Sequence, residues 1–103
     1  MEKQELVDLL NKKIDQIDSL KVDPDKNKLH QWRQETLMVL DQLIGDESKY
    51  YKKFEAVSFQ SNVLSMGNAN ANEQRNMEAR LRGLEKANSE LDAIIFGISN
   101  QLI

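Results

Sequence analysis

The positions of apolar residues along the chain predict four helices joined by short connections. In the first segment, from about Glu2 to Leu20, apolar residues recur at steps of three and four and so share one helical face: Leu6, Leu10, Ile14, Ile17 and Leu20. Asp23 is disfavoured in helical geometry because it precedes Pro24, and proline suits the first turn of a helix. A second helix is therefore predicted from about Pro24 to Ile44.

The second predicted helix carries an apolar stripe of the same spacing and leads into a short third helix. The stripe consists of Leu29, Trp32, Thr36, Val39 or Leu40, and Leu43. Gly45 stands where a C-cap glycine is expected, and Asp46 or Ser48 can cap the helix that follows. This third helix is predicted from about Glu47 to Val57, with its apolar face made by Tyr50, Tyr51, Phe54 and Val57.

A segment rich in Ser and Asn, residues 58–71, separates the third helix from the last. It contains Gly67 and two Asn-Ala pairs, and we expect a loop with little structure. Four apolar residues in it can pack onto the body of the domain: Phe59, Val63, Leu64 and Met66. Because the segment is long for an ordinary connection, it is a candidate for mobility or for contact with a partner.

The last helix is predicted from about Asn72 to Leu102, and its apolar positions follow a heptad repeat. They step by four and three: Met77, Leu81, Leu84, Asn88, Leu91, Ile95, Ile98 and Leu102. A lone polar residue in such a seam, here Asn88, sets register and oligomeric state at a cost in stability. The predicted interaction or oligomer seam is therefore Leu84, Asn88, Leu91, Ile95, Ile98 and Leu102. The alternative is that this helix packs inside its own domain, which Gly83 and Gly97 favour because a long solitary coiled coil avoids glycine.

Composition adds the expectation of one globular domain, residues 1–103. The chain is 40% hydrophobic and 30% charged, and 103 residues are enough for a single core. With the helical periodicities, this predicts an all-α fold, a small antiparallel bundle of three long helices and one short helix. The N-terminal segment is charged and amphipathic rather than signal-like, and no apolar run approaches the roughly 20 residues of a membrane span. The absence of cysteine fits a cytoplasmic location and excludes thiolate sites.

Charge and motif patterns argue against nucleic acid, metal and enzyme chemistry. The 14 basic and 17 acidic residues are mixed along the chain, so no basic field is expected for a phosphate backbone. His30 is the only histidine and has no partner at metal-ligand spacing, and a general-base role lacks a hydroxyl that can be placed beside it. Asp41, Asp46 and Glu47 do not fit a calcium loop, and GNANAN lacks the ending of a phosphate loop. We predict no catalytic residue, no metal and no cofactor.

The ring side chains are concentrated between residues 29 and 59, as a recognition surface or as an anchor of the core. The core interpretation is favoured because one ring buries roughly 150–250 Å² where core area is scarce. The predicted structural core contains Trp32, Leu40, Leu43, Phe54 and Phe59. A separate candidate ligand face is Lys49, Tyr50, Lys52 and Lys53, the composition of a nucleotide or phosphopeptide contact, for which the alternative is an ordinary solvated face.

The stretch LHQWRQETLMVLDQLIGDESKYYKKFEAVSF resembles a helical module at the N-terminus of many bacterial defence-type proteins, where it precedes a TIR-like or other nucleotide-binding effector domain. The residues that carry the resemblance are Trp32, Arg33, Glu35, Thr36, Leu40, Gly45, Phe54, Ser58 and Phe59. The segment LRGLEKANSELDAII is similar to the closing helix of that module. The resemblance implies an adaptor or sensing role and no catalytic residue. Since those proteins continue into an effector, we expect an excised domain or a free-standing relative, such as one carried by a phage or prophage.

The sequence therefore predicts a non-enzymatic protein–protein interaction or oligomerisation module, of adaptor or sensor type, linked to bacterial defence or phage biology. We expect a protein partner, which in one form is a second copy of the chain bound through the last helix. We expect neither a membrane nor nucleic acid as a partner. The alternative is a small regulatory binder of a nucleotide signal or of a defence or host protein, as an inhibitor. That alternative would use the face formed by Lys49, Tyr50, Lys52 and Lys53.

Overall fold

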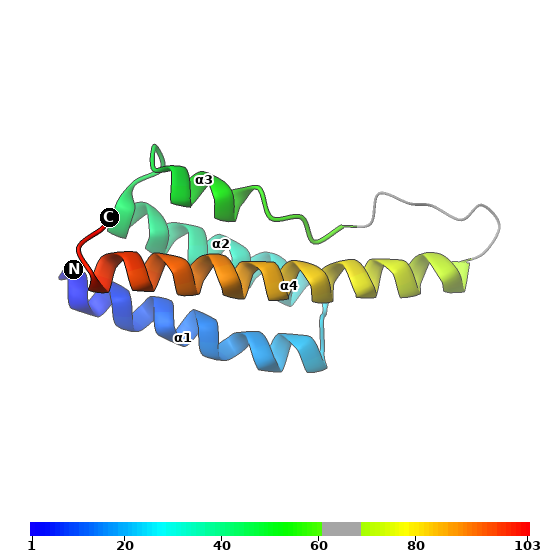
Figure 1. The fold of residues 1–103 in the computed structure, drawn as a ribbon. Helices are drawn as coiled ribbons and strands as arrows, with labels where there is room; N and C mark the ends of the chain where they lie inside the picture. The colour runs from blue at the N-terminus through cyan, green and yellow to red at the C-terminus, as the bar shows by residue number, and fades with distance from the viewer. Residues whose placement is uncertain (61–68) are drawn as a thin grey trace.

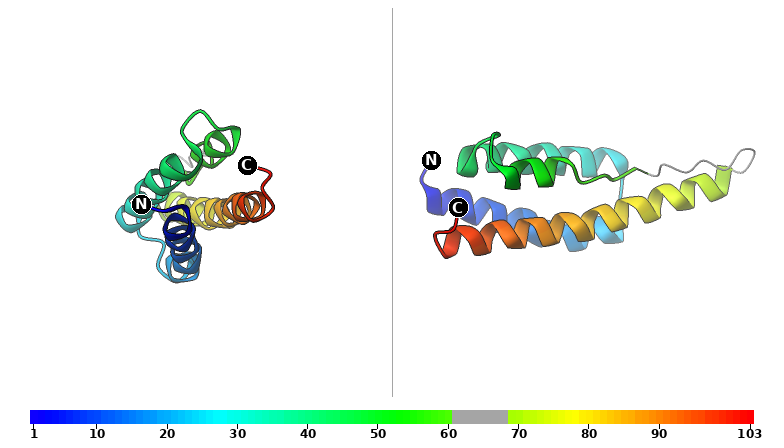
Figure 2. Two further views of the ribbon diagram at one scale, coloured as in Figure 1. Left: turned by 90° about the vertical axis from the view of Figure 1, so that its left-hand side faces the viewer. Right: turned by 45° about the horizontal axis from the view of Figure 1, so that its top comes forward.

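Four helices of alternating direction form the fold. The computed structural model describes residues 1–60 and 69–103, with side chains up to 60 and from 73 onward. The helices are α1 (Lys3–Val22), α2 (Lys26–Ile44), α3 (Lys49–Glu55) and α4 (Ala69–Ser99). Each helix packs against the helices that precede and follow it, and α4 closes the ring against α1 (Figures 1 and 2). This up-and-down bundle confirms the predicted all-α class with three long helices and one short one.

Capping side chains fix where α2 and α3 begin. Asp25 is the N-cap of α2 and its carboxylate accepts the N–H of Lys28 at 3.0 Å, so α2 begins at Lys26. Pro24 therefore precedes the cap, and its predicted place in the first turn of the helix is wrong. Ser48 caps α3 by accepting the N–H of Tyr50 at 3.2 Å. The third helix ends at Glu55, two residues before the predicted end.

The last helix begins and ends earlier than its heptad pattern indicated. It starts at Ala69, inside the segment predicted as a loop, and Val63, Leu64 and Met66 lie outside the described residues. At its other end the Leu102 N–H donates to the Gly97 carbonyl at 2.7 Å, and the Gln101 N–H donates to the Ile98 carbonyl at 3.2 Å. This pair of bonds is a Schellman motif, with Gln101 in the left-handed region at φ 58°. The chain thus leaves the helix after Ser99, and the predicted end at Leu102 is wrong.

Trp32 joins three helices at the centre of the bundle. Its ring lies 6.1 Å from that of Phe54 on α3, at an interplanar angle of 59°. Its indole N–H donates to the Lys13 carbonyl of α1 at 2.9 Å, while its own carbonyl accepts the buried Thr36 hydroxyl at 2.7 Å. Trp32 and Phe54 are both buried, so the aromatic cluster anchors the core, as expected from sequence.

The remaining residues of the predicted core divide into buried and peripheral positions. Leu40 is fully buried, whereas Leu43 and Phe59 are half-buried and pack against the edge of the core. The helices α1 and α4 each bury apolar residues of one face in the core. These residues are Leu6, Leu10, Ile17 and Leu20 on α1, and Leu84, Ala87, Leu91, Ile94 and Ile98 on α4. The apolar stripes read from the sequence on α1 and α2 face this core, whereas only part of the stripe on α4 does.

The short length of α3 leaves one side of the bundle only partly covered by helix. With 7 residues it spans about 10 Å, whereas the 19 residues of α2 span about 28 Å. Beyond its end the chain continues without helical structure over residues 57–60, between the beginning of α2 and the N-terminal half of α4 (Figure 2). The domain is elongated, with extents of 51 × 24 × 18 Å, and none of its described helices is long and apolar enough to cross a membrane.

Candidate functional site

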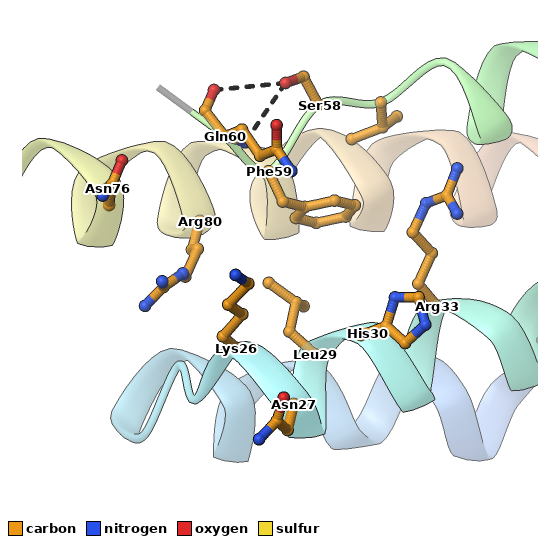
Figure 3. A pocket seen from close by; sticks show the side chains of 11 residues that line it. Lys26, Asn27, Leu29, His30, Arg33, Ser58, Phe59, Gln60, Asn76 and Arg80 are labelled. Atoms are coloured by element: carbon orange, nitrogen blue, oxygen red, sulfur yellow. Dashed lines mark hydrogen bonds between the residues drawn. The ribbon is translucent and has the colours of Figure 1, made fainter. Parts of the chain in front are cut away.

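A cavity of about 530 Å³ opens where α3 has ended, between the first turns of α2, residues 57–60 and α4 (Figure 3). Pockets for small molecules have volumes of about 300–1,000 Å³, so its size suits a small organic ligand. Its walls come from three segments that are far apart in the sequence. The short third helix is the cause, because helical side chains do not fill this part of the bundle.

Three cationic side chains belong to the described lining of the cavity. Lys26 and Arg33 reach it from α2 and Arg80 reaches it from α4, while the exposed imidazole of His30 lies between the two α2 residues. Among the residues that the structure describes, no aspartate or glutamate lines the cavity. The charged side chains of the described lining are therefore all cationic, in a chain whose formal net charge is −3.

The acidic residues that precede α2 are engaged by a different lysine. The carboxylate of Asp23 pairs with the Lys28 ammonium at 2.9 Å, and that of Asp25 accepts the Lys28 N–H. The ion pair and hydrogen bond to Asp23 raise the pKa of Lys28 above its usual value. Lys26 itself has no ion-pair partner among the described residues.

Both arginines are oriented by bonds to the backbone of other segments. Arg33 Nη2 donates to the Glu55 carbonyl at the end of α3 at 2.8 Å, and Arg80 Nη1 donates to the Pro24 carbonyl before α2 at 3.3 Å. A guanidinium carries five N–H donors, so each arginine keeps further donors after making this bond. Two half-buried, tethered cations are thus presented to the cavity.

The apolar part of the cavity is centred on Phe59. Its ring lies above Leu29 of α2, between Lys26 and Arg80 on one side and His30 and Arg33 on the other (Figure 3). The Ser58 hydroxyl bonds with both the N–H and the carbonyl of Gln60 at 3.3 Å, which fixes the turn that carries Phe59.

Gly83 of α4 makes room for this turn. A Cβ atom at position 83 would collide with the Phe59 ring and would lie 2.7 Å from the Ser58 carbonyl oxygen. The residue is buried, so the segment around Phe59 lies directly against the backbone of α4. Glycine is required here by close approach rather than by an unusual backbone angle.

Sequence reasoning missed this site, although part of the signal was present. Lys26, Leu29, His30 and Arg33 are spaced by three, one and three residues and so share one face of α2. That pattern alone describes a basic helix face. Arg80 and Phe59 complete the cavity from distant parts of the chain, and their positions depend on how far α3 extends.

The predicted ligand face on α3 is separate from this cavity. Lys49 Nζ lies 5.2 Å and Lys53 Nζ 5.7 Å from the centre of the Tyr50 ring, within the range of cation–π contacts. Lys52 is exposed on the same helix. The structure therefore brings Lys49, Tyr50 and Lys53 together, and a ligand role for the face that they form with Lys52 stays a prediction.

The predicted oligomer seam requires correction, because half of it is the domain's own core. Leu84, Leu91 and Ile98 are buried against the other helices, and Ile95 is half-buried. Leu102 lies beyond the helix end and is 67% exposed. These residues do not form one outward face, because the core-facing side of α4 is centred on Ala87 and Ile94.

Asn88 lies at the rim of this core, as the intramolecular alternative expected. Its side chain is half-buried, and its Oδ1 atom is buried without a hydrogen-bond partner among the described residues. A buried acceptor without a donor costs about 1–3 kcal/mol. The residue therefore carries an unpaired acceptor at the rim of the core, and its predicted role in setting oligomeric state stays a prediction.

The search for metal ligands and the comparisons with known proteins give no further information about the function of this site. Within residues 1–60 and 69–103, no group of three or more His, Cys, Asp or Glu side chains is placed to hold a metal ion. Comparison with protein-family models, curated proteins and solved structures finds no match. The resemblance to the defence-type module stays a prediction, and the functional argument depends on the fold and the cavity.

Proposed function

We propose that this domain is a non-enzymatic module that binds an anionic ligand in the basic cavity at the start of α2. The observation that carries the proposal is the convergence of Lys26, Arg33 and Arg80 on one cavity whose described lining contains no carboxylate. This corresponds to the regulatory-binder alternative predicted from sequence, placed at the cavity instead of on α3. A sensing or adaptor role linked to bacterial defence is part of the same proposal.

The electrostatics of the cavity favour an anion in the bound state. Like charges gathered on a partly buried surface repel each other, and this repulsion is relieved when an anion enters. Hydrogen bonds from guanidinium and ammonium groups to phosphate or carboxylate oxygens are charge-assisted and stronger than neutral ones. Because both arginines are already oriented by backbone carbonyls, little side-chain entropy is lost on binding.

Calorimetric titration with pyrophosphate tests the proposal. Arg80→Gln and Lys26→Gln each remove one cavity charge, and Lys49→Gln removes a charge of the same kind from α3 as the matched control. One charged hydrogen bond contributes about 1.5–3 kcal/mol, so each cavity variant should weaken binding by roughly 10- to 100-fold. Equal affinity in all three variants, or no binding by the parent protein, would exclude the cavity as an anion site.

A second candidate function, docking of a protein partner, is favoured by apolar residues at the C-terminal end of α4. Phe96 is 63% exposed, and Leu102 and Ile103 are also exposed just beyond the helix. Light scattering over a concentration series tests whether a second copy of the chain is that partner. A dimer that Phe96→Ser with Leu102→Ser splits supports it, and a monomeric mass at every concentration excludes self-association at this surface.

A further inference from the structure

We infer that the ligand of the basic cavity has two chemically different parts, a phosphate group and a planar ring, as a nucleotide does. The inference rests on the proposed anion-binding function and specifies the class of ligand. It follows from the volume of the cavity and from the different side chains at its two ends.

The end formed by Lys26 and Arg80 is suited to phosphate. Lys26 is the first residue of α2, and its exposed ammonium has no ion-pair partner among the described residues. Arg80 is tethered to the Pro24 carbonyl next to it and retains donors for phosphate oxygens. The amides of Asn27, next to Lys26, and of Asn76, one turn before Arg80 on α4, also line the cavity.

The opposite end is suited to a planar ring. His30 and Arg33 present a flat imidazole and a flat guanidinium, and the Phe59 ring lies between them and the phosphate end (Figure 3). Nucleobases stack on aromatic rings and on guanidinium planes with a gain of about 1–3 kcal/mol per base. The bond from Arg33 to the Glu55 carbonyl and the close fit of Phe59 on Gly83 hold two of these planes in place.

The size of the cavity argues against a simple inorganic anion as its ligand. A volume of about 530 Å³ lies within the range of sites for small organic molecules. A phosphate between Lys26 and Arg80 would leave His30, Arg33 and Phe59 without a contact. A phosphate joined to a ring occupies both ends, so each end contributes to affinity.

Calorimetric titrations with ADP, GDP, UDP and pyrophosphate separate the two parts. At least one nucleotide is expected to bind ten times or more tightly than pyrophosphate. His30→Ala should weaken binding of that nucleotide roughly tenfold and leave pyrophosphate unchanged, because His30 is at the ring end. Lys26→Gln should weaken both ligands, and Lys49→Gln should weaken neither. Since His30 and Lys26 are exposed, circular dichroism should show the same fold in these variants.

The outcomes distinguish the failure of this inference from that of the proposed function. If pyrophosphate binds and no nucleotide binds more tightly, the ring part of the inference is overturned and anion binding stands. If neither pyrophosphate nor any of the nucleotides binds, both are overturned. If adenosine binds as tightly as ADP, the phosphate part is overturned.

Discussion

At the scale of single residues, Asn88 offers the most direct way to stabilise the fold. Replacing it with leucine removes the unpaired Oδ1 atom and adds apolar surface at the rim of the core. We expect Asn88→Leu to raise the free energy of unfolding by about 1–2 kcal/mol, measured by urea denaturation. Ser89→Leu, at the exposed neighbouring position, controls for the change in helix propensity. An equal gain in both variants, or a loss in Asn88→Leu, would contradict the assignment of a buried unpaired oxygen.

Glu35 gives the fold a dependence on acid pH. Its carboxylate accepts hydrogen bonds from Lys13 at 2.6 Å and from Gln31 at 3.1 Å, and the bond from Lys13 is the largest cause of a lowered pKa. Because the pKa of Glu35 is lower in the folded chain than in the unfolded chain, ionised Glu35 stabilises the fold. This stabilisation is complete above the unfolded-state pKa of about 4.3 and is lost as the pH falls through the folded-state pKa.

The variant Glu35→Gln tests whether the ionised carboxylate stabilises the fold. The side chain of Glu35 is 43% exposed, so the pair with Lys13 is expected to contribute no more than about 1 kcal/mol at pH 7. The difference in unfolding free energy between parent and variant should shrink toward zero as the pH falls from the unfolded pKa of about 4.3 through the lower folded value. A difference that is independent of pH would show that the ionised carboxylate does not stabilise the fold.

At the scale of elements, two glycines of α4 have different tolerances for alanine. At Gly83 the new Cβ meets a backbone carbonyl and a packed ring, so Gly83→Ala should destabilise the domain by about 1–3 kcal/mol. At Gly97 the new Cβ meets only the Ile103 side chain, which is partly exposed and can rotate away. Gly97→Ala should stay within about 0.5 kcal/mol of the parent, because alanine also favours the helix. Thermal denaturation of both variants checks the contrast, and a similar loss in each would contradict it.

The elements show which features a sequence predicts and which it does not. Apolar periodicity placed all four helices, since each buries one face of its own, and local signals at Ser48 and Gly45 marked the connection from α2 to α3. The sequence shows the heptad pattern of α4, but it does not show which helices pack against α4. A stripe containing Leu84 and Leu91 has the same spacing whether it packs on a second copy or inside its own domain.

At the scale of the whole molecule, Trp32 connects three helices and its loss should affect the entire bundle. It is 3% exposed and contacts α1 by a hydrogen bond and α3 through Phe54. Trp32→Ala should lower the free energy of unfolding by about 3–5 kcal/mol, a large part of the 5–15 kcal/mol typical of a domain. Met38→Ala, at a position of α2 that is 69% exposed, is the control and should change stability little. Guanidinium denaturation compares the two, and equal effects would contradict the central role of Trp32.

The candidate site can be recognised only when the whole fold is considered. The sequence places Lys26, His30 and Arg33 on one face of α2, yet a basic helix face is usually just solvated. The cavity exists because α3 stops at Glu55, the turn at Ser58 directs Phe59 onto Gly83, and Arg80 arrives from α4. These are long-range consequences of packing, which local patterns of charge and hydrophobicity do not contain.

The most direct test of the central claim is a map of amide chemical shifts in ¹H–¹⁵N NMR spectra during titration with pyrophosphate. Anion binding in the cavity predicts saturable shifts concentrated at its phosphate end, around Lys26 and Arg80, with little change around Lys49 and Lys53 on α3. Shifts that are confined to the α3 lysines, or that increase without saturation over the whole surface, would contradict the claim that this cavity is the binding site.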